Sequence, residues 1–252
     1  MTHKPRQQSE SGFYHVVTKG DGAQIVFESD RDRIRYLQKL ADACDDFGTI
    51  IHAYCLMSNH VHLLVQDPKQ NLGYFMKQLN ERYAMYFRTI TGRVGHIFQR
   101  PYWSEPIKTD EHFLCVVRYI HANPQVAGIC ATSQYKWSSY QAHLAESPLV
   151  EVDFTRDLLG GVEQFERFSS SGDTAAVPFP GSKLRGHLSS DELLHIAWAA
   201  IGKDTLNSLK AMQPKERIAP IVALRKAGLT EREIVRLSGI GRASVRNALS
   251  SA

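Results

Sequence analysis

Two β-rich runs joined by a short turn are the most constraining feature of this 252-residue sequence. Residues 49–57 and 61–66 are rich in apolar side chains that favour strands, and Ser58-Asn59 between them is a turn signal, so the segment predicts a β-hairpin. Further β-rich runs lie at residues 13–18 and 102–107. Four strands that include a hairpin favour a domain with an antiparallel sheet.

Amphipathic segments alternate with these strands. Residues 31–47 and 72–90 carry apolar side chains at helical spacing. A third helix is expected over residues 110–123, because Thr109 or Asp110 can cap its start and Pro124 would stop it. The order β-α-β-β-α-β-α predicts an α+β fold, with a ferredoxin-like antiparallel sheet and helices on one face.

The last part of the chain predicts helices only. Ser189 with Glu192 is a capping-box pattern that opens a helix, and residues 216–226 predict another. Thr230 with Glu233 is a second capping-box pattern, and it opens a helix that a Gly-Ile-Gly turn follows. A small all-α domain is therefore expected after the α+β domain.

The order of helix, short glycine turn and helix at the end of the chain is typical of a helix-turn-helix unit. Its second helix would carry four polar residues that can meet phosphates and base edges. A small helical bundle with a solvated basic face is the alternative, but the two caps and the glycine turn together favour the helix-turn-helix. The four residues are Arg242, Ser244, Arg246 and Asn247.

Charge is distributed in blocks. Residues 67–108 hold seven bases and three acids, and residues 210–252 hold nine bases and three acids. Between them, residues 144–182 hold seven acids and two bases and run into a segment rich in Ser, Gly and Pro. Two basic lobes are typical of a protein that contacts a polyanion twice. The expected regions are a first domain over residues 1–145, an acidic connector over 146–185 and a helical domain over 186–252.

Composition excludes several classes of protein. With 43% apolar residues and a net charge of +4, the composition is that of a folded protein and excludes a disordered one. Its 4 Cys form no C-x-x-C pair, which argues against a disulfide scaffold and a cysteine zinc site. No apolar run approaches the ~20 residues of a membrane span and no signal peptide is recognisable, so a cytoplasmic protein without a membrane partner is expected.

Two histidines stand on the second strand of the hairpin. Because side chains alternate along a strand, His60 and His62 should point to one face, roughly 7 Å apart at Cα, and Val61 to the other. Two imidazoles on one face can hold a divalent metal. With 11 His in the chain, about half a His-x-His pair is expected by chance, so the pair alone is weak evidence.

A second group of polar residues lies at the end of the third helix. Helical spacing puts Tyr119 and Asn123 on one face, where they present a phenol and an amide oxygen together. A phenol beside a metal can attack a phosphodiester and form a phosphotyrosine. An arbitrary helical Tyr is more often a core residue, and spacing alone does not separate the two interpretations.

Five ordered motifs resemble those of the REP-associated tyrosine transposases, members of the HUH single-strand endonuclease superfamily. The motifs are YHVVTKG at 14–20, HAYCLMSNHVHLLV at 52–65, GRVGHIFQRPYWS at 92–104, RYIHANPQVAG at 118–128 and KWSSYQAH at 136–143. The resemblance covers about residues 12–145. It implies the HUH transposase fold for the first domain.

The resemblance also implies residue roles and a reaction. His60 and His62 would hold Mg²⁺ or Mn²⁺, Asn123 would complete the site, and Tyr119 would be the nucleophile. The products of cleavage would be a 5′-phosphotyrosine and a free 3′-hydroxyl, and strand transfer would reverse the step without a nucleotide cofactor. What deprotonates Tyr119 stays open, with His112 and His121 nearby in sequence.

The resemblance implies single-stranded or hairpin DNA, folded from REP-like palindromes, as the substrate. An unpaired strand reaches a metal on a sheet face more easily than a duplex does. Four bases are expected to follow the DNA backbone: Lys77, Arg82, Arg88 and Arg100. The helical domain is similar to the duplex-binding domain of the bacterial replication initiator, which implies a second contact with duplex DNA.

The sequence therefore predicts a metal-dependent DNA endonuclease and strand transferase. A non-catalytic DNA-binding regulator with the same fold is the alternative, although four intact site residues argue against it. A phosphodiesterase or an RNA-binding protein is a third class, and the aromatic sheet motif expected for RNA is missing. The sequence leaves open whether the protein is a monomer or a homodimer.

Overall fold

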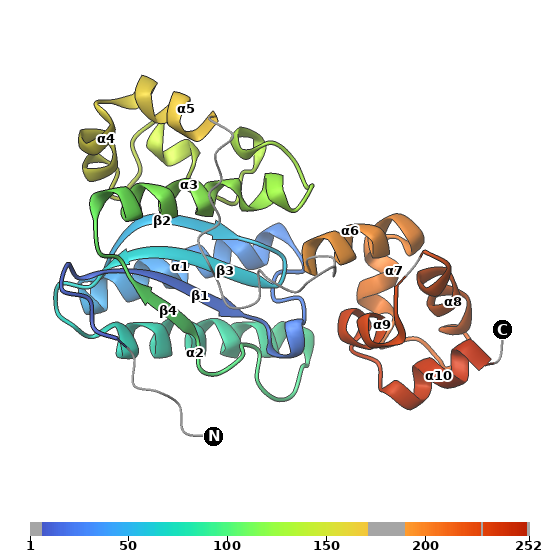
Figure 1. Ribbon diagram of the computed structural model, residues 1–252. Coiled ribbons are helices and arrows are strands. Elements are labelled where there is room, and N and C mark those ends of the chain that lie inside the picture. Colours follow the sequence, from blue (N-terminus) through green and yellow to red (C-terminus); the bar gives the residue numbers. More distant parts are fainter. Residues whose placement is uncertain (1–6, 171–189, 228, 251–252) are drawn as a thin grey trace.

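A four-stranded antiparallel sheet forms the centre of the N-terminal lobe in the computed structural model, which describes residues 7–170, 190–227 and 229–250 (Figure 1). The strand order is β2-β3-β1-β4. This order and the succession β-α-β-β-α-β-α confirm the expected ferredoxin-like α+β fold. The strands are β1 (Phe13–Lys19), β2 (Ile50–Leu56), β3 (His60–Gln66) and β4 (Trp103–Pro106).

Helices cover both faces of the sheet. Helices α1 (Asp30–Phe47) and α2 (Leu72–Thr91) pack on one face, and α3 (Asp110–Val126) packs on the other (Figure 1). The prediction of helices on one face was wrong in this respect. The reason lies in β3, which is buried along almost its whole length, so that both of its faces need apolar cover.

Local signals explain most helix ends. Ser29 caps α1 in a capping box with Asp32, and Gly92 ends α2 in the left-handed conformation at φ 64°. The predicted stop at Pro124 was wrong, because α3 continues to Val126. Proline cannot donate to the carbonyl four residues back, which is that of Ile120. Nδ2 of Asn123 reaches this carbonyl at 3.5 Å and donates to the Tyr119 carbonyl at 2.8 Å.

Part of the expected connector is folded onto the N-terminal lobe. Helices α4 (Asp153–Leu159) and α5 (Val162–Ser170) pack beside α3, and Phe165 is fully buried against the ring of His143, 4.7 Å away. The apolar side chains of these helices complete the core on the α3 face. The N-terminal lobe thus extends beyond residue 145, and the rest of the expected connector, residues 171–185, lies outside the described residues.

The C-terminal lobe consists of helices around one apolar core. The predicted capping box of Thr230 and Glu233 is present, and Gly239 at φ 66° ends α9 before α10 begins. The expected Ser189 cap lies outside the described residues. No helix in the described ranges is long and apolar enough to span a membrane. The helices are α6 (Ser190–Ile201), α7 (Lys203–Ser208), α8 (Ile218–Lys226), α9 (Glu231–Ser238) and α10 (Arg242–Ser250).

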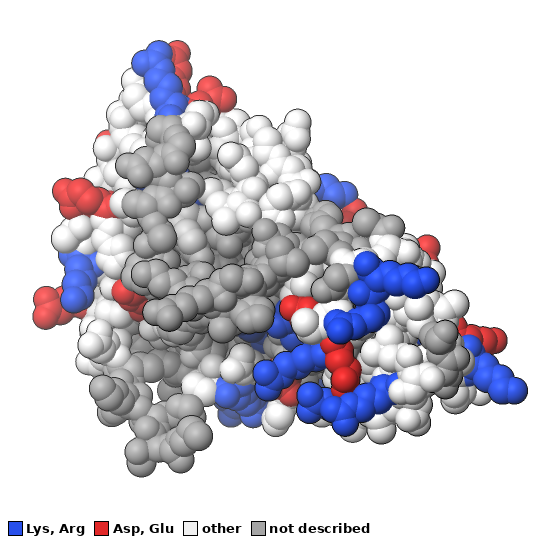
Figure 2. All heavy atoms as spheres, turned by 45° about the vertical axis from the view of Figure 1, so that its right-hand side comes forward, with Lys and Arg blue, Asp and Glu red and all other residues white. Residues whose placement is uncertain are grey.

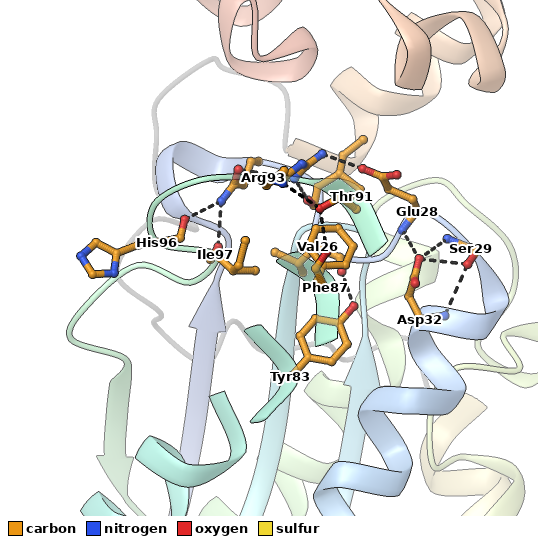
Figure 3. A network of polar contacts seen from close by, with 12 residues as sticks. Val26, Glu28, Ser29, Asp32, Tyr83, Phe87, Thr91, Arg93, His96 and Ile97 are labelled. Atoms are coloured by element: carbon orange, nitrogen blue, oxygen red, sulfur yellow. Dashed lines mark hydrogen bonds and ion pairs between the residues drawn. The ribbon is translucent and has the colours of Figure 1, made fainter. Parts of the chain in front are cut away.

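The two lobes meet at the loop between β1 and α1. Ile25 of this loop is 5% exposed and belongs to the core of the C-terminal helices. Arg93 holds the same loop from the other side, because its guanidinium donates to the Ile25 carbonyl at 2.7 Å and to the Glu28 carboxylate at 2.6 Å (Figure 3). A network of charged and polar groups therefore supports the loop on which the C-terminal lobe rests.

Candidate active site

The register of the central strands gathers three histidines on the face that α3 covers. His62 lies opposite Val17 in β1, and His15 is two residues before Val17, so both imidazoles point to the same side. Nε2 of His15 lies 3.1 Å from Nδ1 of His62. The ring of His60 is 4.9 Å from the ring of His62, measured between centroids. The predicted pair of histidines thus shares one face, as expected from strand alternation.

Hydrogen bonds fix how the imidazoles present their nitrogens. Nδ1 of His60 lies 2.8 Å from Oδ1 of Asn59. Because an amide oxygen only accepts, His60 must donate from Nδ1, and its Nε2 is the unprotonated nitrogen. An unprotonated imidazole nitrogen is the form that ligates a metal.

The histidines of the site are neutral. Burial lowers the pKa of His15 and of His60 to about 3, and it lowers the pKa of His62 well below its ordinary value. The neighbouring charge of Lys19, which lies opposite His60 in the sheet, lowers the pKa of His60 further. Neutral imidazoles meet the first requirement of a metal site, because a protonated ring cannot coordinate.

Tyr119 on α3 faces these histidines. Its ring centroid is 5.5 Å from that of His62 and 5.7 Å from that of His15, and its side chain is partly buried. Burial raises the pKa of the Tyr119 phenol to about 12, with a smaller contribution from Cys55. The predicted nucleophile and the predicted imidazoles therefore lie side by side, and the phenol is protonated near neutral pH.

Asn123 lies one helical turn after Tyr119. Its Nδ2 atom donates to the Tyr119 carbonyl, which commits the amide nitrogen to the helix, so Oδ1 is the atom of this side chain whose lone pairs suit the predicted role of a metal ligand. In the described part of the chain, no cluster of three or more His, Cys, Asp or Glu side chains is arranged to hold a metal ion. The donor set fits a metal that takes two imidazoles and an amide oxygen and completes its shell with substrate and water oxygens.

The structure separates the two histidines that could serve Tyr119 as a base. Nε2 of His121 lies 2.7 Å from Oγ of Ser139, and its ring packs against Phe165, so His121 belongs to the core on the far side of α3. Burial is the main cause of the lowered pKa of His15, and His112 adds a smaller electrostatic contribution, which puts His112 within electrostatic range of His15. Of the two, only His112 is close to the site.

Sequence reasoning missed His15, Asn59 and Lys19. His15 was detectable, because it is a polar residue in the middle of an otherwise apolar strand, on the same side of that strand as Phe13 and Val17. Asn59 was assigned only to the turn, and its bond to His60 depends on the geometry of the hairpin.

Three of the four predicted bases of the N-terminal lobe line one recess, which we call the α2–β4 cavity. It has a volume of about 510 Å³ and lies between α2 and the segment that precedes β4. Lys77, Arg88 and Arg100 line it. The fourth base, Arg82, does not, because its guanidinium is paired with Asp46 of α1 at 2.6 Å.

The four predicted residues of α10 lie on two flanks of that helix, and all are exposed. Arg242 and Arg246 both pair with Glu231 of α9, at 3.3 and 2.9 Å. Ser244 and Asn247 lie on the opposite flank and line a recess with residues 214–218. Figure 2 shows basic side chains gathered over the part of the molecule that the C-terminal helices form, with acidic side chains between some of them.

Comparisons with known proteins show which proteins the chain resembles. The sequence model of the family "Transposase IS200 like" matches residues 8–123. A REP-associated tyrosine transposase bound to a REP hairpin is 17% identical, with 61% of this chain and 90% of that chain covered and a TM-score of 0.47. A candidate transposase from Deinococcus radiodurans R1 is 18% identical, with 52% and 99% covered and a TM-score of 0.34. No match is found among curated proteins.

Proposed function

Residues 8–123 match the sequence model of the family "Transposase IS200 like", and on that basis we propose that the protein is a metal-dependent transposase that cleaves and transfers single-stranded DNA through Tyr119. The observation that supports this most directly is the contact of the Tyr119 ring with His62, at 5.5 Å between centroids. A phenol beside paired neutral imidazoles combines a nucleophile with metal ligands.

Tyr119 attacks the scissile phosphorus in line with the departing 3′ oxygen. The bond between the phenol oxygen and phosphorus forms while the bond between phosphorus and the 3′ oxygen breaks. The phenol proton leaves Tyr119, and the 3′ oxygen gains a proton, so that a 5′-phosphotyrosine and a 3′-hydroxyl result. Since one phosphodiester replaces another, a second 3′-hydroxyl can reverse the step and join a new strand.

Binding of Mg²⁺ or Mn²⁺ by His60, His62 and Asn123 would supply positive charge to the non-bridging phosphate oxygens and orient the phosphate. The protein contributes the rigid arrangement of these ligands. Nδ1 of His62 forms a hydrogen bond with His15, and Nδ1 of His60 forms one with Asn59, so the orientation of both rings in the sheet is fixed. Lys19 beside His60 adds a positive charge that attracts the DNA phosphate.

An unpaired strand is the substrate that this site accepts best. Tyr119 and the histidines lie between α3 and the sheet, where Tyr119 is only partly exposed. A single strand can bend its backbone into this space, whereas a stacked duplex keeps its phosphates on a rigid outer surface. Hairpin DNA with unpaired flanks, formed by REP-like palindromes, offers both a strand to cut and a duplex stem.

The C-terminal lobe would bind duplex DNA. Its α9, glycine turn and α10 have the order of a helix-turn-helix, and the bases Arg242 and Arg246 are exposed on α10. Ser244 and Asn247 on the other flank could meet base edges. A duplex contact on the same chain raises the effective concentration of the single-stranded segment near Tyr119.

The test is formation of a covalent protein–DNA adduct. Hairpin oligonucleotides with randomised single-stranded flanks are incubated with the full chain in Mn²⁺ or Mg²⁺ and resolved in denaturing gels. The wild type should form an adduct that EDTA prevents, and Tyr119→Phe and His62→Ala should form none. An adduct of equal yield in Tyr119→Phe would refute the proposal, as would an adduct that forms equally on flankless duplex.

A further inference from the structure

The α2–β4 cavity has no role in the chemistry of Tyr119, yet it combines features that suit one ligand class. Its volume of about 510 Å³ falls within the ~300–1,000 Å³ of small-molecule sites. We propose that this cavity binds one unpaired nucleotide of the DNA strand that enters the active site. The proposal rests on the proposed function, because it assigns the DNA of that function a second point of contact.

An unsatisfied amide lies in the wall of the cavity. Asn80 lines it, and the Oδ1 atom of Asn80 is buried without a hydrogen-bond partner among the described residues. A buried carbonyl without a partner is costly, so its position is best explained by a donor that arrives with a ligand. Asn side chains bond base edges through both atoms of the amide, and the N3–H group of thymine, like the exocyclic amino group of the other bases, is such a donor.

Cations surround this amide. Lys77 and Arg88 are exposed, and Arg100 is held 3.5 Å from the carboxylate of Glu81. The three bases exceed the single acid that lines the cavity, so an anion is favoured at its mouth. In a nucleotide bound with its base inside the cavity, the base would meet the amide in the wall and the phosphate would meet the cations at the mouth.

Aromatic side chains form another wall. Tyr102 lines the cavity and is partly exposed, and His96 beside it is exposed, whereas Phe98 of the same lining is 5% exposed and belongs to the core. Rings of this kind stack on bases of any sequence. An inorganic phosphate or a metabolite with phosphate alone would use the cations and leave this wall unused, so the lining favours a nucleotide.

The cavity is connected to the active site through the edge of the sheet. The Gln99 amide donates to the Lys19 carbonyl at 2.7 Å, and Phe98 forms a bridge to Gly20, so the lining segment extends the sheet beside β1. Lys19 in turn lies opposite His60. Two strand spacings, about 10 Å, therefore separate this segment from the backbone of His60. A single strand that leaves the cavity can cross this edge and reach His60 and Tyr119.

Photocrosslinking tests the proposal without catalysis. The probe is a hairpin oligonucleotide with an eight-thymine single-stranded arm, in which 5-iodouracil replaces each thymine in turn, irradiated with the full chain in EDTA. One or two neighbouring positions of the arm should crosslink to His96 or Tyr102. Asn80→Leu should lower this yield at least five-fold. Arg88→Ala should weaken binding of the arm, and the slope of log affinity against log salt concentration should become shallower by about one, as expected for the loss of one phosphate contact.

Matched controls separate binding from folding. Leucine has the same number and branching of side-chain heavy atoms as asparagine and removes the unpartnered carbonyl, so the melting temperature of Asn80→Leu should be unchanged or raised. Arg35→Ala removes an equal charge from α1, where Arg35 bonds to Gln38, and should leave crosslinking unchanged. Crosslinks outside the cavity, or an equal yield in Asn80→Leu, would overturn the proposal.

The outcome is distinguishable from that of the proposed function. If Tyr119 forms an adduct with DNA but the crosslinks map elsewhere, only the nucleotide site fails. If the crosslinks map to the cavity but no adduct forms with any oligonucleotide, the nucleotide site stands and the cleavage reaction fails.

Discussion

Nε2 of His15 lies 3.1 Å from Nδ1 of His62, in a diagonal contact between β1 and β3. The contact joins His15, a residue of the motif YHVVTKG for which the sequence predicted no role, to one of the two expected metal ligands. Partners of this kind orient a ligating imidazole and set which nitrogen carries the proton. His15 is therefore a positioning residue of the site.

Replacing His15 should weaken metal binding. His15→Ala leaves Nδ1 of His62 without this partner, and loss of such a partner lowers metal affinity by about 10- to 100-fold. His15→Gln keeps a polar group at the position and should lose less. Titration of Mn²⁺ followed by electron paramagnetic resonance measures both affinities. Equal Mn²⁺ affinity in His15→Ala and wild type would contradict the assignment.

Removing Glu231 should tighten binding to duplex DNA. Glu231 pairs with both Arg242 and Arg246, so it lowers the positive charge that they offer to phosphates. Glu231→Gln should raise the affinity for a duplex of random sequence and make the slope of log affinity against log salt concentration steeper. Arg246→Ala should lower the affinity and make this slope shallower by about one, as expected for the loss of one phosphate contact. Fluorescence anisotropy at several salt concentrations gives both quantities, and weaker binding by Glu231→Gln would count against this surface.

Acid should destabilise the N-terminal lobe through His143. Burial lowers the pKa of His143 to about 4, while the unfolded side chain titrates near 6.5. Between these values the unfolded chain binds more protons, so stability is present above pH 6.5 and falls as the pH decreases toward 4, by up to about 1.4 kcal/mol per pH unit for this group.

His143→Phe should flatten that dependence, because phenylalanine does not titrate and can keep the stacking on Phe165. The loss of the hydrogen bond from Nδ1 to the Ser139 carbonyl should lower stability at pH 7 by about 1 kcal/mol. Urea unfolding at intervals from pH 4 to pH 7 compares the two slopes. Parallel curves for variant and wild type would show that His143 does not titrate on unfolding.

Ile25→Asp should separate the two lobes. Burying an isoleucine is worth about 1.5–3 kcal/mol, and a carboxylate in the same apolar place is unfavourable. The radius of gyration in solution scattering should rise in the variant, while Asp21→Asn, an exposed change in the same loop, should leave it at the wild-type value. An unchanged radius in Ile25→Asp would mean that this contact does not hold the lobes together.

Periodicity and caps predicted the strands and most helices, because residues such as Val61 and Leu63 alternate with the histidines and caps such as Thr230 act locally. They did not predict that helices cover both faces of the sheet. That outcome depends on which apolar surfaces remain after pairing, and Phe165 in the expected connector fills one of them. The expected connector was identified by its acidic composition, and its two helices, α4 and α5, were not predicted.

For the site, spacing placed His60 and His62 on one face, and the structure brings Tyr119 to them. The contact of His15 with His62 depends on the register between β1 and β3, which no local signal fixes. The pairing of Arg82 with Asp46 likewise depends on how α1 and α2 pack, so a list of bases could not separate Arg82 from those that line the cavity.

Mass spectrometry of the protein–DNA adduct tests the central claim most directly. After nuclease digestion and cleavage by trypsin, the peptide of residues 119–136 should carry a nucleotide phosphate, and fragmentation should place it on Tyr119. The same peptide contains Tyr135 as an internal control, because the Tyr135 hydroxyl is buried and donates to the Leu56 carbonyl at 2.8 Å. Modification of Tyr119 alone, dependent on Mn²⁺ or Mg²⁺, is the predicted result. A phosphate on Tyr135 or on another residue, or cleaved DNA without any protein adduct, would contradict the account.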